Sequence, residues 1–183
     1  YIVQGPPGSG KTILANQIAH NADRTGRSVF ISVLGESHAR MMLHLSAMTF
    51  FDLGRIPNQI AYIGAYQALE DDGLKGLLAL IRREVQARDA VFMVLDGLSA
   101  VEAQAESVFA MKRFAHELQT LASMLNCTML LLTSASGADG APERTMVDGI
   151  IDMQQRTFGV RRERRLIVHK LRGSAFLEGE HPY

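Results

Sequence analysis

The residues with the clearest chemical potential form the octapeptide GPPGSGKT, from Gly5 to Thr12. Its spacing matches the pattern G-x-x-x-x-G-K-[ST], in which backbone amides wrap a phosphate group at the start of a helix. Lys11 can then reach the terminal phosphates, and the Thr12 hydroxyl can bind Mg²⁺. The octapeptide therefore predicts a site for a nucleoside triphosphate and its magnesium ion. The predicted nucleotide contacts here are Gly5, Gly8, Ser9, Gly10, Lys11, Thr12 and Ile13.

A second oxygen ligand for the metal is predicted at the end of an apolar segment, AVFMVLD, whose last residue is Asp96. An aspartate that ends a buried strand commonly holds the Mg²⁺ shell in such sites. Motors of the AAA type place a glutamate directly after this aspartate, but Gly97 follows here. Glu36 is the expected water-orienting carboxylate, because it comes just after another apolar segment, residues 28–34. Ligands of open α/β sheets bind beyond the carboxyl ends of strands.

These residues need a sheet to bring them together, and the hydrophobic pattern predicts one. Short apolar segments, typical of strands buried on both faces, alternate with segments of helical periodicity. The predicted strands are residues 1–3, 28–34, 60–64, 90–96 and 128–134, and the predicted helices are 12–22, 73–88 and 107–126. This alternation predicts a mostly parallel sheet with helices on both faces. Residues 149–155 and 164–171 are expected to form a C-terminal antiparallel hairpin.

Composition limits the remaining possibilities. The 183 residues suffice for one domain, and 19 Lys and Arg balance 19 Asp and Glu, so no overall charge attracts nucleic acid. No apolar segment approaches the ~18 residues of a membrane span. The single cysteine, Cys127, lies in an apolar segment and favours a reducing, cytoplasmic location. Because Tyr1 opens directly on a strand, we expect a lead-in segment to be missing.

Two cations near the end of the chain stand on one face of a predicted strand. In VHKLRGS, residues 168–174, side chains alternate between faces, so Lys170 and Arg172 point the same way. A solvated strand face is the simplest interpretation of such a pair. A role in stabilising phosphate charge is the alternative.

The order of these segments, closed by MVDGIIDMQ and HKLRGSAFLEGEHPY, resembles the KaiC and bacterial RadA branch of the RecA-like P-loop ATPases over nearly the whole chain. The resemblance implies a single RecA/KaiC-like domain over residues 1–183, which forms a hexameric ring with ATP and Mg²⁺ at subunit interfaces. It further implies that Lys170 and Arg172 reach the neighbour's triphosphate. The nucleotide contacts implied on this strand are Lys170, Leu171, Arg172 and Ser174.

The function expected is therefore Mg²⁺-dependent ATP hydrolysis that changes conformation or partner affinity, as in clock-like signalling. Glu36, Lys11, Lys170 and Arg172 would be catalytic, and Thr12 and Asp96 would bind the metal. The chain departs from the family, which commonly has two acidic residues where Gly35 and Glu36 stand, and a histidine where Phe176 stands.

Two other functions remain open. Because Gly35 stands where the family commonly has an acidic residue, it favours a non-catalytic, ATP-gated binding module. The resemblance to RadA allows a DNA-repair ATPase. Nucleic acid is not the favoured partner, because the arginines of residues 156–165 fit a solvated hairpin. A protein partner and autokinase activity, with Thr145 near the position that clock proteins phosphorylate, are weaker expectations.

Overall fold

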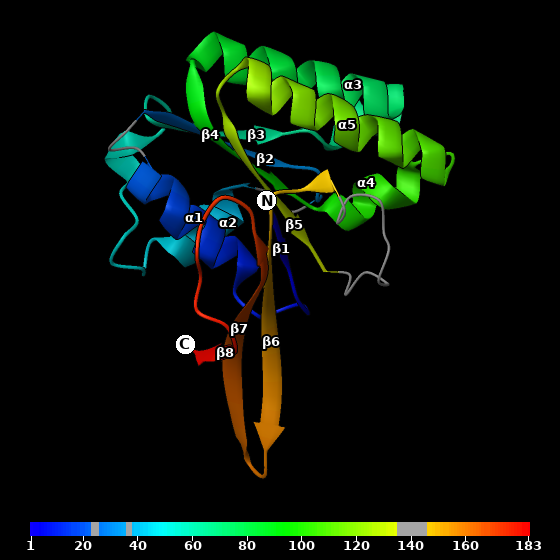
Figure 1. Ribbon diagram of the computed structural model, residues 1–183. Helices are drawn as coiled ribbons and strands as arrows, with labels where there is room; N and C mark the ends of the chain where they lie inside the picture. The colour runs from blue at the N-terminus through cyan, green and yellow to red at the C-terminus, as the bar shows by residue number, and fades with distance from the viewer. Residues whose placement is uncertain (23–25, 36–37, 135–145) are drawn as a thin grey trace.

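The structure, a computed structural model, describes residues 1–22, 26–35, 38–134 and 146–183 (Figure 1). Within these ranges, eight strands form one sheet in the order β3-β2-β4-β5-β1-β6-β7-β8. The strands are β1 Ile2–Gln4, β2 Arg27–Ser32, β3 Ile60–Gly64, β4 Ala90–Asp96, β5 Thr128–Thr133, β6 Gly149–Phe158, β7 Arg161–Leu171 and β8 Glu180–Pro182. The helices are α1 Lys11–Ala22, α2 His38–Leu45, α3 Tyr66–Arg88, α4 Leu98–Gln104 and α5 Val108–Met124, with a 3-10 helix η1 at Leu53–Arg55.

The sheet confirms the predicted fold class. Strands β3, β2, β4, β5, β1 and β6 are parallel neighbours, whereas β6 with β7 and β7 with β8 are antiparallel. Helices α3 and α5 cover one face, and α1 and α2 lie on the other (Figure 1). Within the described ranges, every helix is too short or too polar to serve as a transmembrane span.

Alternation along β4 explains why Asp96 points toward the loop. Met93 and Leu95 belong to the core beneath α3 and α5. Phe92 and Val94 belong to the core beneath α1. Because side chains alternate along a strand, Asp96 shares the α1 face with Phe92 and Val94. Burying each of these large side chains contributes about 1.5–3 kcal/mol, so the core fixes the direction of Asp96.

Three α-helices differ from the sequence prediction: α3 begins earlier, and α2 and α4 were not predicted. Helix α3 begins at Tyr66, seven residues before the predicted start at residue 73. Gly73 has φ 61° and ψ −150°, a non-helical conformation inside this span. The predicted segment began at this glycine, and the turns before it contribute Leu69 to the same core. Helix α2 was not predicted, because its 8 residues are fewer than the window over which helical periodicity is usually recognised.

The hairpin is longer than predicted and extends past the sheet. Only Ile150–Asp152 of β6 pair with β1, whereas β6 and β7 pair with each other from Gly149 to Phe158. The far half therefore projects beyond the carboxyl edge of the parallel strands (Figure 1). Glu180 of β8 forms ion pairs with Arg156, at 2.5 Å, and with Arg165, at 2.8 Å. These pairs tie the returning C-terminal segment to the hairpin.

Candidate active site

The phosphate-loop segment, residues 5–10, joins β1 to α1 at the carboxyl edge of the sheet. Gly5 packs so tightly against β6 that an added Cβ would lie 2.2 Å from the Met153 carbonyl oxygen. Gly8 and Gly10 have φ of 78° and 95°, in the region that favours glycine. The loop conformation therefore requires all three glycines, of which the pattern specifies Gly5 and Gly10.

Lys11 lies across this loop. Its Nζ donates to the Gly5 carbonyl at 2.6 Å and to the Pro6 carbonyl at 3.0 Å. Burial lowers the pKa of the Lys11 ammonium, and the nearby Asp96 carboxylate opposes that shift. The ammonium is thus held where an anion bound by the loop amides would meet it.

Thr12 and Asp96 meet as predicted from their positions. The Thr12 hydroxyl donates to Asp96 Oδ2 at 3.0 Å, and Asp96 is 9% exposed. A hydroxyl and a carboxylate are the oxygen ligands that Mg²⁺ prefers, and Mg²⁺ sites commonly use few protein ligands. The two residues fit the predicted metal, which would lie between the loop and β4.

Glu36 lies outside the described residues, so its role stays a prediction, as does that of Thr145. The strand that leads to Glu36 is described, and its end lies beside Asp96. Ser32 is the β2 partner of Asp96, and the Val33 amide donates to the Asp96 carbonyl at 3.0 Å. The segment that leads to Glu36 therefore leaves the sheet beside the predicted metal site.

Gly97 explains why no carboxylate directly follows Asp96. Its φ is 108°, and an added Cβ would lie 2.6 Å from Cγ2 of Val33 and 2.9 Å from Cδ2 of Leu34. The positive φ and the side chains of Val33 and Leu34, which follow β2, therefore disfavour a glutamate at this position. A water-orienting carboxylate has to come from another segment.

Gly97→Ala is expected to destabilise the protein by about 1–3 kcal/mol, through backbone strain and overpacking against Val33 and Leu34. Since roughly 2–4 °C of Tm corresponds to each kcal/mol in a domain of this size, thermal unfolding should show a clear drop. Gly35→Ala is the matched control, because an added Cβ there has nothing within 4 Å. Equal Tm values for the two variants would contradict this account.

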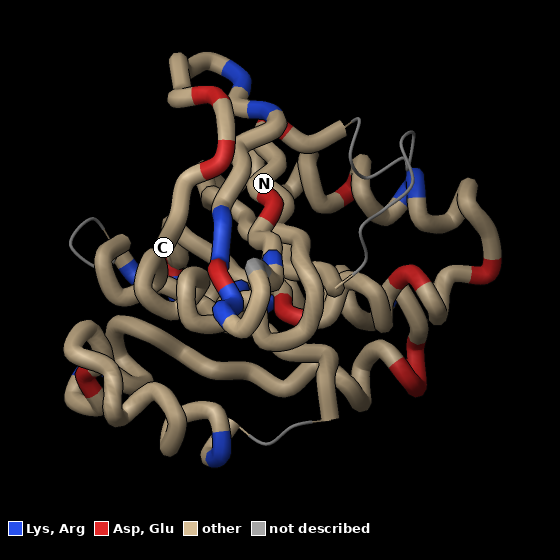
Figure 2. The backbone as a smooth tube through the Cα atoms, turned by 90° about the horizontal axis from the view of Figure 1, so that it is seen from below, with Lys and Arg blue, Asp and Glu red and all other residues tan. Residues whose placement is uncertain are grey.

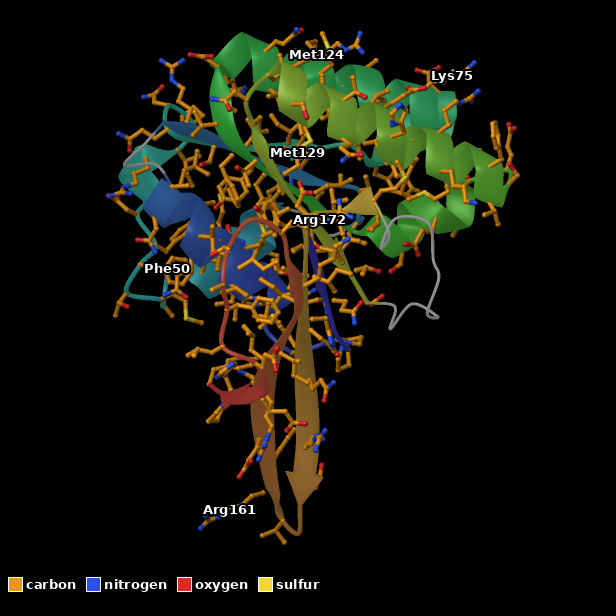
Figure 3. All side chains as sticks on the ribbon, in the orientation of Figure 1. Phe50, Lys75, Met124, Met129, Arg161 and Arg172 are labelled. Carbon is orange, nitrogen blue, oxygen red and sulfur yellow. The ribbon has the colours of Figure 1, made fainter. Side chains whose placement is uncertain are left out.

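Strand β7 ends at Leu171, at the amino-terminal edge of the parallel strands, so Lys170 is on the strand, whereas Arg172, predicted to be on it, follows in a turn. Lys170 pairs with Ile150, which is level with Ile2 at the start of β1. The Arg172 amide donates to the Asp148 carbonyl at 2.7 Å. Asp148 is four residues before the β6 partner of Gln4, or about 13 Å at 3.3 Å per residue. Figure 3 shows Arg172 beside the amino-terminal end of β1, away from the hairpin tip. Leu171 and Ser174 lie with these cations, so none of the four joins the chain's own loop.

Comparison with known proteins identifies the family. The family described as "ATPase: KaiC" matches residues 1–183. The chain belongs to this KaiC ATPase family. A UPF0273 protein from Thermotoga maritima is 24% identical over 204 residues, covering all of this chain and 82% of that protein.

The circadian clock oscillator protein KaiC itself is also similar. The proteins from Nostoc sp. and Parasynechococcus marenigrum are 26% and 23% identical over 195 residues. Each match covers the whole of this chain and 38% of the clock protein. This KaiC-family chain therefore spans about two-fifths of the length of those relatives.

Sequence reasoning missed one wall of the site in this KaiC-family chain. A cavity of about 230 Å³ lies beside Thr12 and Asp96, and residues of α2 line one side of it. His38 of α2 lines it, and burial lowers the pKa of this imidazole. The remaining lining residues are Ile13, Ser32, Leu34, Met41, His44 and Leu45. A histidine two residues after Glu36 was the available signal, but α2 itself was not predicted.

Proposed function

We propose that this chain is a Mg²⁺-dependent ATPase whose complete sites form between subunits. The observation that carries the proposal is the convergence of Lys11, Thr12 and Asp96 around one loop at the carboxyl edge of the sheet. Membership in the KaiC ATPase family supports the same conclusion. ATP would lie on the loop amides, with its terminal phosphates facing Lys11.

Each residue of the site would have a separate task. The loop amides and Lys11 hold the phosphates, and Thr12 and Asp96 hold Mg²⁺, which would supply charge neutralisation on the phosphate oxygens. Glu36 orients the attacking water, and Lys170 and Arg172 of a neighbouring subunit offset charge that develops in the transition state. Catalysis of this kind depends mainly on positioning and electrostatics.

The place of the two cations favours sites shared between subunits. Arg172 is exposed, and its carboxylate contact to Asp148 is long, at 3.7 Å. Such an exposed pair is worth about 0–1 kcal/mol, so a neighbour's triphosphate can readily displace it. We propose a ring, hexameric as the family resemblance implies, in the cytoplasm, whose ATP state alters its shape or its affinity for a protein partner.

Lys11→Ala tests the nucleotide site most directly. The variant should lose most of its affinity for MgATP, because the Lys11 ammonium lies across the loop that would bind the phosphates, and should keep its fold. Calorimetric titration of parent and variant, with circular dichroism of both, measures this. Lys75→Ala is the control, since Lys75 is on α3 far from the loop in the sequence. Equal MgATP affinity in Lys11→Ala and parent would refute the site.

A non-catalytic, ATP-gated module is the second candidate, and Gly35 is the observation that favours it. It predicts tight MgATP binding with no phosphate release.

A DNA-dependent ATPase has less support. Figure 2 shows basic and acidic segments interspersed rather than gathered into one continuous basic face. Two of the hairpin arginines, Arg156 and Arg165, are paired with Glu180. DNA-stimulated turnover with a steep salt dependence would favour that alternative. Autokinase activity would appear as phosphate retained on the protein.

A further inference from the structure

The outer side of the phosphate-loop segment is in contact with the last residue of the described chain. The Tyr183 hydroxyl donates a hydrogen bond to the Ser9 carbonyl. The ring also lies near Gly10, where an added Cβ would be 4.0 Å from Tyr183 Cε2. Ser9 is fully buried, so its carbonyl needs a partner within the protein. Tyr183 supplies that partner across 174 residues of sequence.

Tyr183 is held by the sheet rather than by the loop. Strand β8 pairs with β7, with Pro182 opposite Arg165. The Tyr183 amide then donates to the Arg164 carbonyl at 3.2 Å. Glu180 adds the ion pairs to the hairpin described above. The hydroxyl therefore comes from a fixed support, which can restrain the loop.

The geometry of one peptide unit shows what this restraint does. The Ser9 carbonyl and the Gly10 amide belong to one planar trans peptide, so they point in opposite directions. A hydrogen bond that holds the carbonyl toward β8 also holds the Gly10 N–H away from β8. Rotation of this unit changes the φ of Gly10, and glycine tolerates both signs of φ. Without an anchor, the orientation of this amide would be poorly fixed.

We propose that Tyr183 is a positioning residue of the phosphate loop, whose hydroxyl holds the Ser9–Gly10 peptide so that the Gly10 amide faces the bound phosphates. The proposal rests on the function proposed above and adds a residue outside the G-x-x-x-x-G-K-[ST] pattern. Burial raises the pKa of the Tyr183 phenol, so the hydroxyl stays protonated near neutral pH and able to donate. Phenylalanine at this position would keep the ring and lose the anchor.

Tyr183→Phe is the direct test. The affinities for MgATP and MgADP should both fall by about three- to tenfold, the range expected for one lost hydrogen bond. KM for ATP should rise while kcat changes less, since the amide holds ground state and transition state alike. Tyr66→Phe is the matched control, because it removes an exposed hydroxyl that bonds Glu70 on α3. That control should keep parental affinity and Tm, whereas Tyr183→Phe should also lower Tm by a few degrees, because the buried Ser9 carbonyl loses its partner.

The Gly10 amide gives a second readout that does not depend on activity. In nucleotide-free, ¹⁵N-labelled protein, Tyr183→Phe should shift and broaden the Gly10 amide resonance, and Tyr66→Phe should leave it unchanged. Parental nucleotide affinity and an unchanged Gly10 resonance in Tyr183→Phe would overturn the proposal. So would a loss of affinity seen only in Tyr183→Ala, since ring packing would then be the cause. A parent that fails to bind MgATP would instead refute the nucleotide site itself.

Discussion

Arg172→Ala should reduce ATP turnover by up to about 10³–10⁵-fold while MgATP still binds, the effect attributed to arginines that complete a phosphoryl-transfer site. The reason is positional. Arg172 is on the amino-terminal side of β1, and the loop leaves β1 from its other end. Its guanidinium can therefore stabilise phosphate charge only in a neighbouring subunit. Phosphate release at saturating ATP, measured over a series of protein concentrations, gives the effect.

Mixing variants separates a shared site from a defective fold. Arg172→Ala subunits keep an intact loop, and Lys11→Ala subunits keep intact cations. An interface that joins an intact loop to intact cations should recover part of the activity. Arg161→Ala, at the far end of strand β7, is the control and should keep parental turnover. Mixed oligomers without recovery, or a dilute monomer as active as the assembly, would mean that the two cations are a solvated strand face.

Glu36→Gln should keep MgATP affinity and lose about 10²–10⁴-fold in turnover, the usual contribution of a general base. The phosphates and the metal are held by other residues, so binding does not need this carboxylate. Calorimetry and single-turnover phosphate release, carried out on the same preparation, measure the two properties separately.

Glu70→Gln, an exposed residue at the start of α3, is the control for the loss of one carboxylate charge. If Glu36→Gln and Glu70→Gln release phosphate at the parental rate, another group orients the water. In that case His38, which lines the cavity beside Asp96, is the next residue to change.

The parts of the fold that the sequence predicted are those with a strong local signal. Strands β3 and β4 are short apolar segments, and their observed bounds, Ile60–Gly64 and Ala90–Asp96, equal the predicted ones. The core stripe of α5 was also predicted, and Met111, Phe114, Leu118 and Leu121 are buried. Cys127 is buried, as its apolar segment indicated. Burial of these side chains produces strand or helix spacing of apolar residues within a short segment, and that spacing can be recognised in the sequence.

The parts that were not predicted depend on contacts between distant segments. The pairing of β8 with β7 brings Tyr183 to Ser9, and nothing near either residue in the sequence indicates the other. Alternation alone predicted one strand face for Lys170 and Arg172, but β7 ends at Leu171, so Arg172 lies in the turn that follows. Their distance from the loop followed only from the sheet order and from the register of β6 with β7. Gly97 was noted as a departure, and only the close passage of Val33 explains it.

Because the loop and the cations lie at opposite edges of one sheet, the number of complete sites in an assembly depends on how its subunits are arranged. Two subunits that share a site in this way meet head to tail, through two different surfaces, rather than across a two-fold axis. An open row of n such subunits has n − 1 complete sites, and closure of the row supplies the last one. Turnover per subunit would then depend on closure as well as on contact. Any row that stayed open would carry an idle loop at one end and an idle pair of cations at the other.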